Sequence, residues 1–128
     1  PEEPAEEPVF SEAVVRKQLH ARIFPYVQGE PIPSGRFLQW FDRDKMPADY
    51  EIRTRRPGDK LALRGVGHKS LRALMTEKNV PVELRERLPL LTAGGEIIWA
   101  IGLRRSSLYQ VDETTTTILE LRYEGEET

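Results

Sequence analysis

The stretch from Arg53 to Leu91 constrains the fold most, because proline and glycine interrupt it too often for long helices or strands. The Pro57–Gly58 pair predicts a tight turn, with the Asp59 side chain hydrogen-bonded back to the turn backbone. Pro81 suits the first position of a helix, and Pro89 predicts the end of that helix. We therefore expect two short helices between short strands.

The first of these helices is predicted to begin near Lys69 and to end at Asn79. Its packing face is formed by residues at i, i+3, i+4 and i+7, namely Leu71, Leu74, Met75 and the aliphatic stem of Lys78. Its opposite face is polar and carries Lys69, Arg72 and Thr76. Gly65 and Gly67 precede the helix, so we expect a loop there whose backbone amides lie close to a ligand at the helix N-terminus.

Strand signals lie on both sides of this stretch. Residues 18–24 alternate with period two, which places His20 on the solvent face, and a turn at 93–96 joins two apolar strands, the second with Trp99 in the core. The predicted strands are Gln18–Phe24, Arg36–Phe41, Tyr50–Thr54, Leu90–Leu91, Ile97–Ile101 and Thr114–Tyr123, and Leu61–Leu63 is a short apolar run. Because the helices do not alternate regularly with these strands, we predict an α+β fold with a mixed, sandwich-like sheet and two central helices.

The chain ends differ in composition from the middle. Residues 1–12 are acidic and proline-rich and predict a linker, although residues 12–16 are compatible with a helical turn. We expect one domain over residues 13–123, an acidic tail at 124–128 and a fragment of a longer protein. The chain has no cysteine and therefore no disulfide framework. It has no apolar run long enough to span a bilayer and does not open with a signal peptide, so we interpret it as cytoplasmic.

Charge is segregated along the chain. Residues 1–12 hold five acidic and no basic side chains, and residues 112–128 hold six acidic side chains and one arginine. Residues 52–78 hold eight basic and two acidic side chains. Such a run is often only a solvated face, but here cations, glycines and a predicted helix start fall in one short segment. The middle of the chain is therefore a candidate site for a polyanion.

Several kinds of chemistry do not fit the sequence. Lys69-Ser70 matches the end of a phosphate-binding P-loop, but Leu63 stands where the first glycine is required. No Gly-x-Ser-x-Gly elbow is present, and the two histidines lack nearby ligands at zinc spacing. Asp42, Asp44 and Asp49 lack the spacing of a calcium loop and are interpreted as a solvated turn. We predict no catalytic residue, metal ligand or cofactor site.

Binding to a polyanion remains the best interpretation. The candidate contacts share positive charge or an exposed backbone amide: Arg53, Arg55, Arg56, Arg64, Gly67, His68, Lys69 and Arg72. Arg104 and Arg105 add two cations that could lie beside the basic helix or simply solubilise a strand end. The basic stretch lacks an aromatic ladder, which favours backbone contacts to a folded or duplex nucleic acid over single-strand stacking.

Five motifs in this order carry a family resemblance: FDRDK (41–45), RTRRPGD (53–59), GVGHKSLRAL (65–74), VPVELRERLPLL (80–91) and IWAIGLR (98–104). Over residues 40–105 the chain resembles the C-terminal domain of bacterial tRNA(Ile)-lysidine synthetases. Such enzymes use ATP to attach lysine to the wobble cytidine of a minor isoleucine tRNA, which changes the decoded codon from AUG to AUA. The family's catalytic Ser-Gly-Gly-x-Asp-Ser loop has no counterpart here, and no family motif is recognised over residues 9–39.

The resemblance implies a non-catalytic tRNA-binding module with the sandwich and flanking helices found in part of the phenylalanyl-tRNA synthetase β subunit. Its expected partners are tRNA(Ile) and the N-terminal catalytic domain, which would use the ATP and lysine. The alternative is a docking module whose arginines meet carboxylates of the catalytic domain or another subunit. The oligomeric state is left open by the sequence.

Overall fold

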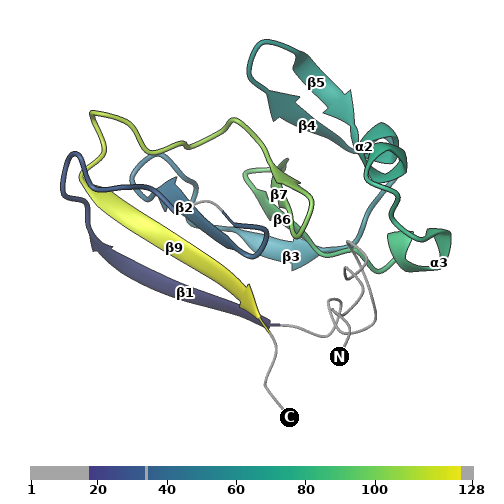
Figure 1. Cartoon of the computed structure of the whole chain (residues 1–128), viewed down its shortest axis with the longest axis horizontal. Helices are drawn as coiled ribbons and strands as arrows, with labels where there is room; N and C mark the ends of the chain where they lie inside the picture. The colour runs from purple at the N-terminus through teal and green to yellow at the C-terminus, as the bar shows by residue number, and fades with distance from the viewer. Residues whose placement is uncertain (1–17, 34, 125–128) are drawn as a thin grey trace, which may run out of the picture.

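The computed structural model describes residues 18–33 and 35–124, which form two β-sheets and two short helices (Figure 1). The predicted α+β class is confirmed, and most of the regular secondary structure of the described residues is sheet. The predicted linker at 1–12, the helical turn at 12–16 and residues 125–128 of the tail lie outside the described residues.

The first sheet is antiparallel and has the order β1 (Gln18–Pro25), β9 (Thr117–Glu124), β2 (Leu38–Asp42). It confirms the three strands expected in these regions and the exposed position of His20. The alternation in β1 also predicts a buried face formed by Leu19, Ala21 and Ile23, and this is wrong for Ile23, which lies on the inner face but is 55% exposed. The strand β1 is the edge of this sheet, so its apolar side chains are only partly covered.

The second sheet has the order β3 (Glu51–Arg53), β6 (Leu90–Ala93), β7 (Glu96–Ala100), β4 (Lys60–Leu63), β5 (Gly67–Ser70). A two-residue strand, β8 (Arg104–Arg105), pairs with β7. The predicted hairpin between β6 and β7 is confirmed, with Gly94 and Gly95 at φ values of 60° and 84° that favour glycine. The pairing of β4 with β7 is parallel, whereas the other pairings of this sheet are antiparallel.

Two apolar cores use opposite faces of β7. Ile97 and Ala100 pack toward the helices, while Ile98 and Trp99 pack between the sheets. Trp99 is 1% exposed, which confirms its predicted core position. A strand buried on both faces is a rigid centre to which the more exposed elements attach.

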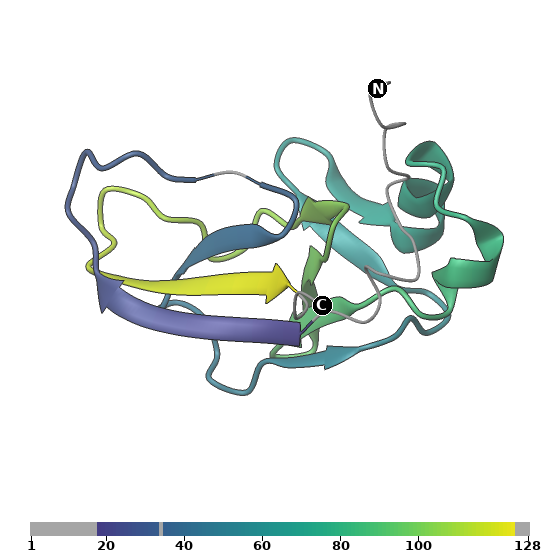
Figure 2. The same cartoon turned by 60° about the horizontal axis from the view of Figure 1, so that its bottom comes forward.

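The helices α2 (Leu71–Glu77) and α3 (Val82–Arg85) lie at the end of the molecule away from the β1–β2 connection (Figures 1 and 2). Leu71, Leu74 and Met75 are buried as predicted. Asn79 closes α2 with a φ of 56°, also as predicted. The side chain of Lys78 is exposed, contrary to prediction, because the helix has already ended at Glu77.

The predicted ligand-binding loop before α2 is wrong. Residues Gly67–Ser70 form β5, which pairs antiparallel with β4, and the glycines serve the turn of this hairpin, where Gly65 has a φ of 78°. The helix therefore begins at Leu71 instead of near Lys69, and the Ser70 hydroxyl caps it by accepting a hydrogen bond from the Ala73 amide at 3.0 Å. The second helix is also shorter than expected and ends at Arg85, before Pro89.

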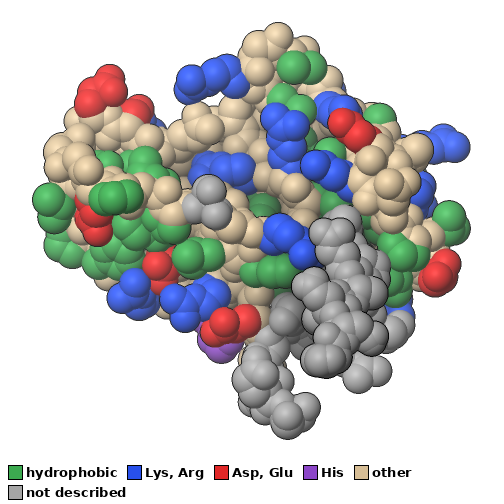
Figure 3. Space-filling view, in the orientation of Figure 1, with side chains coloured by type: hydrophobic (Ala, Val, Ile, Leu, Met, Phe, Trp, Pro, Cys, Tyr) green, Lys and Arg blue, Asp and Glu red, His purple; other side chains and the backbone are tan. Residues whose placement is uncertain are grey.

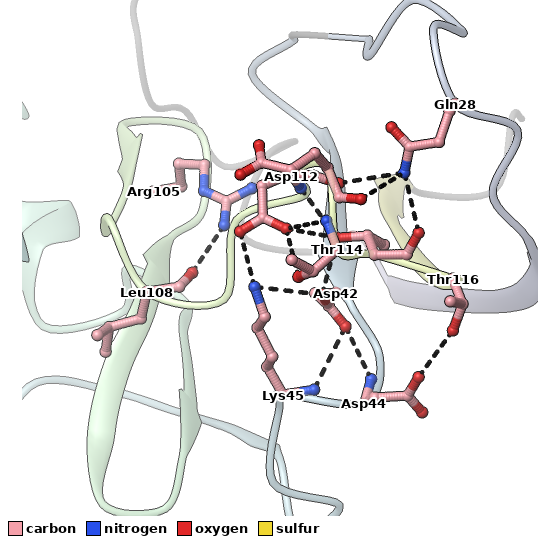
Figure 4. Close-up of polar contacts among 11 residues, drawn as sticks. Gln28, Asp42, Asp44, Lys45, Arg105, Leu108, Asp112, Thr114 and Thr116 are labelled. Carbon is pink, nitrogen blue, oxygen red and sulfur yellow. Dashed lines mark hydrogen bonds and ion pairs between the residues drawn. The ribbon is translucent and has the colours of Figure 1, made fainter.

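Asp42 is not part of a solvated turn, because it is 2% exposed and accepts hydrogen bonds at the end of β2. The Thr115 hydroxyl donates to it at 2.8 Å, and the Asp44 amide donates at 3.0 Å (Figure 4). Lys45 pairs with both Asp42 and Asp112, and its hydrogen bond holds the pKa of Asp112 far below the ordinary value. This network fixes the loop before β9, which explains why β9 begins at Thr117 and not at Thr114.

Candidate nucleic-acid interface

A concave groove of ≈ 780 Å³ opens between the Arg55–Lys60 turn, β5 and the two helices. Its lining includes five cationic side chains, Arg55, Arg56, Lys60, Arg72 and Arg85, together with His68. The carboxylates in the lining are Asp59 and Glu86, so the groove has a formal excess of three positive charges. Lys and Arg side chains gather over this half of the molecule, whereas hydrophobic side chains gather over the opposite end (Figure 3).

The turn presents Arg56 to the groove. The Asp59 carboxylate accepts a hydrogen bond from the Arg56 amide at 2.8 Å, and the Asp59 amide donates a hydrogen bond to the Arg56 carbonyl at 3.2 Å. These two bonds confirm the predicted turn. Gly58 has a φ of 85°, as a turn of this kind requires. The Arg56 side chain is exposed and makes no ion pair among the described residues. Its guanidinium is therefore available to an anion.

Arg53 holds the turn from the other side. Its Nη1 and Nη2 atoms each donate to the Asp59 carboxylate at 3.0 Å, and the two side chains are only 16% and 11% exposed. Burial alone would raise the pKa of Asp59, but the hydrogen bonds from Arg53 and the Arg56 amide outweigh it and lower the pKa. Arg53 does not line the groove, so we assign it to the turn instead of to a ligand.

The β4–β5 hairpin contributes one of its faces. Lys60 pairs with Ser70 and Ala62 with His68, so these four residues share a face, and three of them line the groove. Lys69 belongs to the opposite face, and its ammonium pairs with Glu77 of α2. That hydrogen bond lowers the pKa of Glu77. The hairpin thus separates His68 from Lys69, although they are neighbours in sequence.

The helices form the remaining wall. Arg72 of α2 is exposed and has no ion-pair partner in the part of the chain that the structure describes. Arg85 of α3 donates from Nε to the Val80 carbonyl at 2.9 Å, which holds the side chain against the end of α2. Arg55 donates from Nε and Nη2 to one oxygen of Glu86, at 3.1 and 2.6 Å.

The remaining predicted residues lie away from the groove. Arg64 is at the tip of the hairpin and donates to the Gln110 side chain at 3.0 Å, and Gly67 begins β5. Arg104 is exposed on β8, whereas Arg105 points inward. The sequence therefore grouped residues that the fold divides between a groove, a hairpin tip and the protein interior.

Arg105 is held by main-chain carbonyls. It donates to Trp40 O at 2.7 Å, Leu108 O at 2.8 Å and Ser106 O at 3.1 Å, and its guanidinium lies 4.2 Å from the Phe41 ring centroid. Figure 4 shows its bond to Leu108. Burial lowers the pKa of Arg105 to about 10, which still leaves it charged at neutral pH. These contacts assign Arg105 to the structure of the domain.

Lys60 and Arg85 were missing from the predicted site. Leu61 and Leu63 alternate with period two and lie in the core, which places Lys60 on the outer face of β4. The sequence could have shown this only if residues 67–70 had been assigned to a strand that pairs with β4. No local pattern distinguished Arg85, since its position depends on its bond to the end of α2.

Two negative findings concern the described residues alone. Within 18–33 and 35–124, no group of three or more His, Asp or Glu side chains is arranged to hold a metal ion. No helix in this part of the chain is long and apolar enough to cross a membrane.

The fold and the groove define a class: an α+β sandwich domain with a concave, cationic surface suited to a polyanion. The family model described as the TilS substrate C-terminal domain matches residues 50–122. This chain belongs to that family. The matched segment contains every residue that lines the groove.

Curated relatives are longer proteins. The tRNA(Ile)-lysidine synthase of Caldanaerobacter subterraneus subsp. tengcongensis is 31% identical over 110 residues, which are 85% of this chain and 24% of that protein. The tRNA(Ile)-lysidine synthase of Symbiobacterium thermophilum is 37% identical over 83 residues, 64% of this chain and 17% of that protein. The chain thus spans about a quarter or less of these relatives' length.

A solved structure supports the fold. The crystal structure of a TilS C-terminal domain superposes with a TM-score of 0.77 at 22% sequence identity, covering 89% of this chain and 88% of that one. The predicted fold class and the predicted family are both confirmed.

Proposed function

We propose that this domain binds tRNA for a tRNA(Ile)-lysidine synthase, with the groove lying against the phosphate backbone. The observation that carries the proposal is the convergence of Arg56, Lys60 and Arg72 from a turn, a strand and a helix onto one concave surface without ion-pair partners among the described residues. When lysine or arginine side chains without carboxylate partners meet phosphates, the counterions condensed on the nucleic acid are released. This release is a major source of affinity for nucleic acids.

The chemistry of such an enzyme would be carried out elsewhere in a longer polypeptide. A catalytic domain would use ATP to ligate lysine to the wobble cytidine of tRNA(Ile) in the cytoplasm, so that AUA is read in place of AUG. This domain would hold the tRNA while that reaction proceeds. The length of the relatives, about four times that of this chain, is consistent with such a division of labour.

Charge reversal at single positions tests the proposal. Arg56→Glu and Arg72→Glu should each weaken binding of tRNA(Ile) to this chain by roughly tenfold or more, because each replaces a charge-assisted phosphate contact with repulsion. Arg43→Glu is the matched control, since Arg43 is an exposed arginine in the turn after β2 and outside the groove. Equal losses in all three variants would mean that only overall charge matters, and the groove would have no special role.

A further inference from the structure

We infer that the groove holds an unpaired nucleotide of the RNA, with its base against the flat face of Arg55 and its phosphates on Arg56, Lys60 and Arg72. The inference rests on the proposed function and goes beyond it by naming the kind of RNA element that enters the groove. It also replaces the expectation of duplex backbone contacts alone.

The guanidinium of Arg55 is fixed in a single plane. Its Nε and Nη2 atoms both donate to Glu86, and its Nη1 lies 3.8 Å from the Met75 sulfur. The hydrogen bond and charge of Arg55 lower the pKa of Glu86, so this carboxylate stays ionised at neutral pH. Hydrogen bonds made in the plane of a guanidinium do not use its faces, and unpaired bases stack on such faces.

Because Glu86 already compensates its charge, Arg55 is less suited to a phosphate than the other cations of the groove. A single carboxylate oxygen receives both of its strong hydrogen bonds. The side chain is 30% exposed, and it lines the groove from the turn side. Its geometry favours stacking over a second charge pair.

Apolar surface lies in the same groove. Pro57 lines it and is exposed, and Val82 lines it while remaining 72% exposed at the start of α3. A single exposed valine is common on protein surfaces, but here it borders a cluster of cations. Phosphate oxygens gain nothing from apolar side chains, whereas a base or a ribose buries its faces on them.

The size of the groove suits this ligand. Its volume of ≈ 780 Å³ falls within the range of roughly 300–1,000 Å³ that is typical of pockets for single small molecules. Arg56, Lys60 and Arg72 come from three different elements around the groove, so the phosphates on either side of one nucleotide would meet separate side chains.

The experiment compares two RNA hairpins of identical stem and loop, one blunt and one with a four-nucleotide single-stranded 3′ extension. The 128-residue chain should bind the extended hairpin roughly tenfold more tightly, which is the scale of one stacked base. Arg55→Lys keeps the positive charge but removes the planar guanidinium, and Val82→Ser removes the exposed apolar side chain that lines the groove. Each variant should lose most of the preference for the extension, which is measured as the ratio of the dissociation constants of the two hairpins.

Three outcomes would overturn the inference. Equal, salt-sensitive binding of both hairpins would refute the inference that an unpaired nucleotide occupies the groove, and it would leave the proposed function intact. Full retention of the preference in Arg55→Lys would show that only the charge of this residue matters. Failure of both hairpins and of tRNA(Ile) to bind at low salt would refute the proposed function as well. Thermal unfolding of each variant checks that the domain remains folded.

Discussion

Replacing Arg105 with methionine tests whether this arginine stabilises the fold, as its contacts indicate, or meets RNA, as the sequence predicted. The substitution keeps an unbranched apolar stem over Phe41 but removes hydrogen bonds of 2.7, 2.8 and 3.1 Å to three main-chain carbonyls. A hydrogen bond from a charged donor contributes about 1.5–3 kcal/mol, and the regained desolvation energy of the guanidinium offsets part of the sum. We expect Arg105→Met to lower the free energy of unfolding by about 3 kcal/mol.

Urea unfolding followed by tryptophan fluorescence measures this change, because Trp40 and Trp99 are buried at 6% and 1% exposure. The melting temperature should fall by roughly 10 °C. Arg104→Met is the matched control: Arg104 is exposed, so its loss should change the free energy by less than about 0.5 kcal/mol. The reasoning is refuted if Arg105→Met is as stable as the parent chain but binds tRNA more weakly.

Three further changes test other parts of the structure. Ser70→Ala removes the cap of α2 and should cost about 1 kcal/mol in urea unfolding, whereas Ser70→Asp should retain most of the stability. Gly94→Ala should cost more than Gly95→Ala, because both residues have positive φ but the new methyl group at Gly94 would lie 3.1 Å from Pro47; equal melting temperatures would contradict this. The lowered pKa of Asp59 means that its stabilisation is present above its ordinary value of 3.8 and is lost as the pH falls below it. Asp59→Asn should therefore be about 2 kcal/mol less stable than the parent chain at pH ~6, and this difference should shrink as the pH falls through the lowered pKa of Asp59. A difference that is independent of pH would exclude this explanation.

Local patterns in the sequence predicted the parts of the fold that depend on neighbouring residues. The Pro57–Gly58 turn, the hairpin at Gly94 and the burial of Trp99 follow from turn chemistry and apolar spacing within a few positions. The assignment of Gly67–Ser70 to a loop failed because the glycines at 65 and 67 are compatible both with a ligand-binding loop and with the turn of a strand hairpin. Only the pairing with Lys60–Leu63 decides between them.

The candidate site was predicted as a segment but not residue by residue. Whether an arginine is free depends on partners far away in sequence: Arg55 meets Glu86, 31 positions later, and Arg105 meets the Trp40 carbonyl, 65 positions earlier. A run of like charges predicts which segment is basic, because the charge of a segment is summed over residues that are neighbours in sequence. It does not predict which of those charges the fold neutralises or buries.

The salt dependence of tRNA binding tests the central claim most directly. The logarithm of the association constant should fall with the logarithm of the salt concentration, with a slope of about 0.9 for each phosphate contact on duplex RNA or somewhat less on single strands. The double variant Arg56→Gln/Arg72→Gln should reduce that slope by about 1.8, while Arg43→Gln should leave it unchanged. A slope that is the same in the parent chain and the double variant would show that the groove does not meet the phosphates.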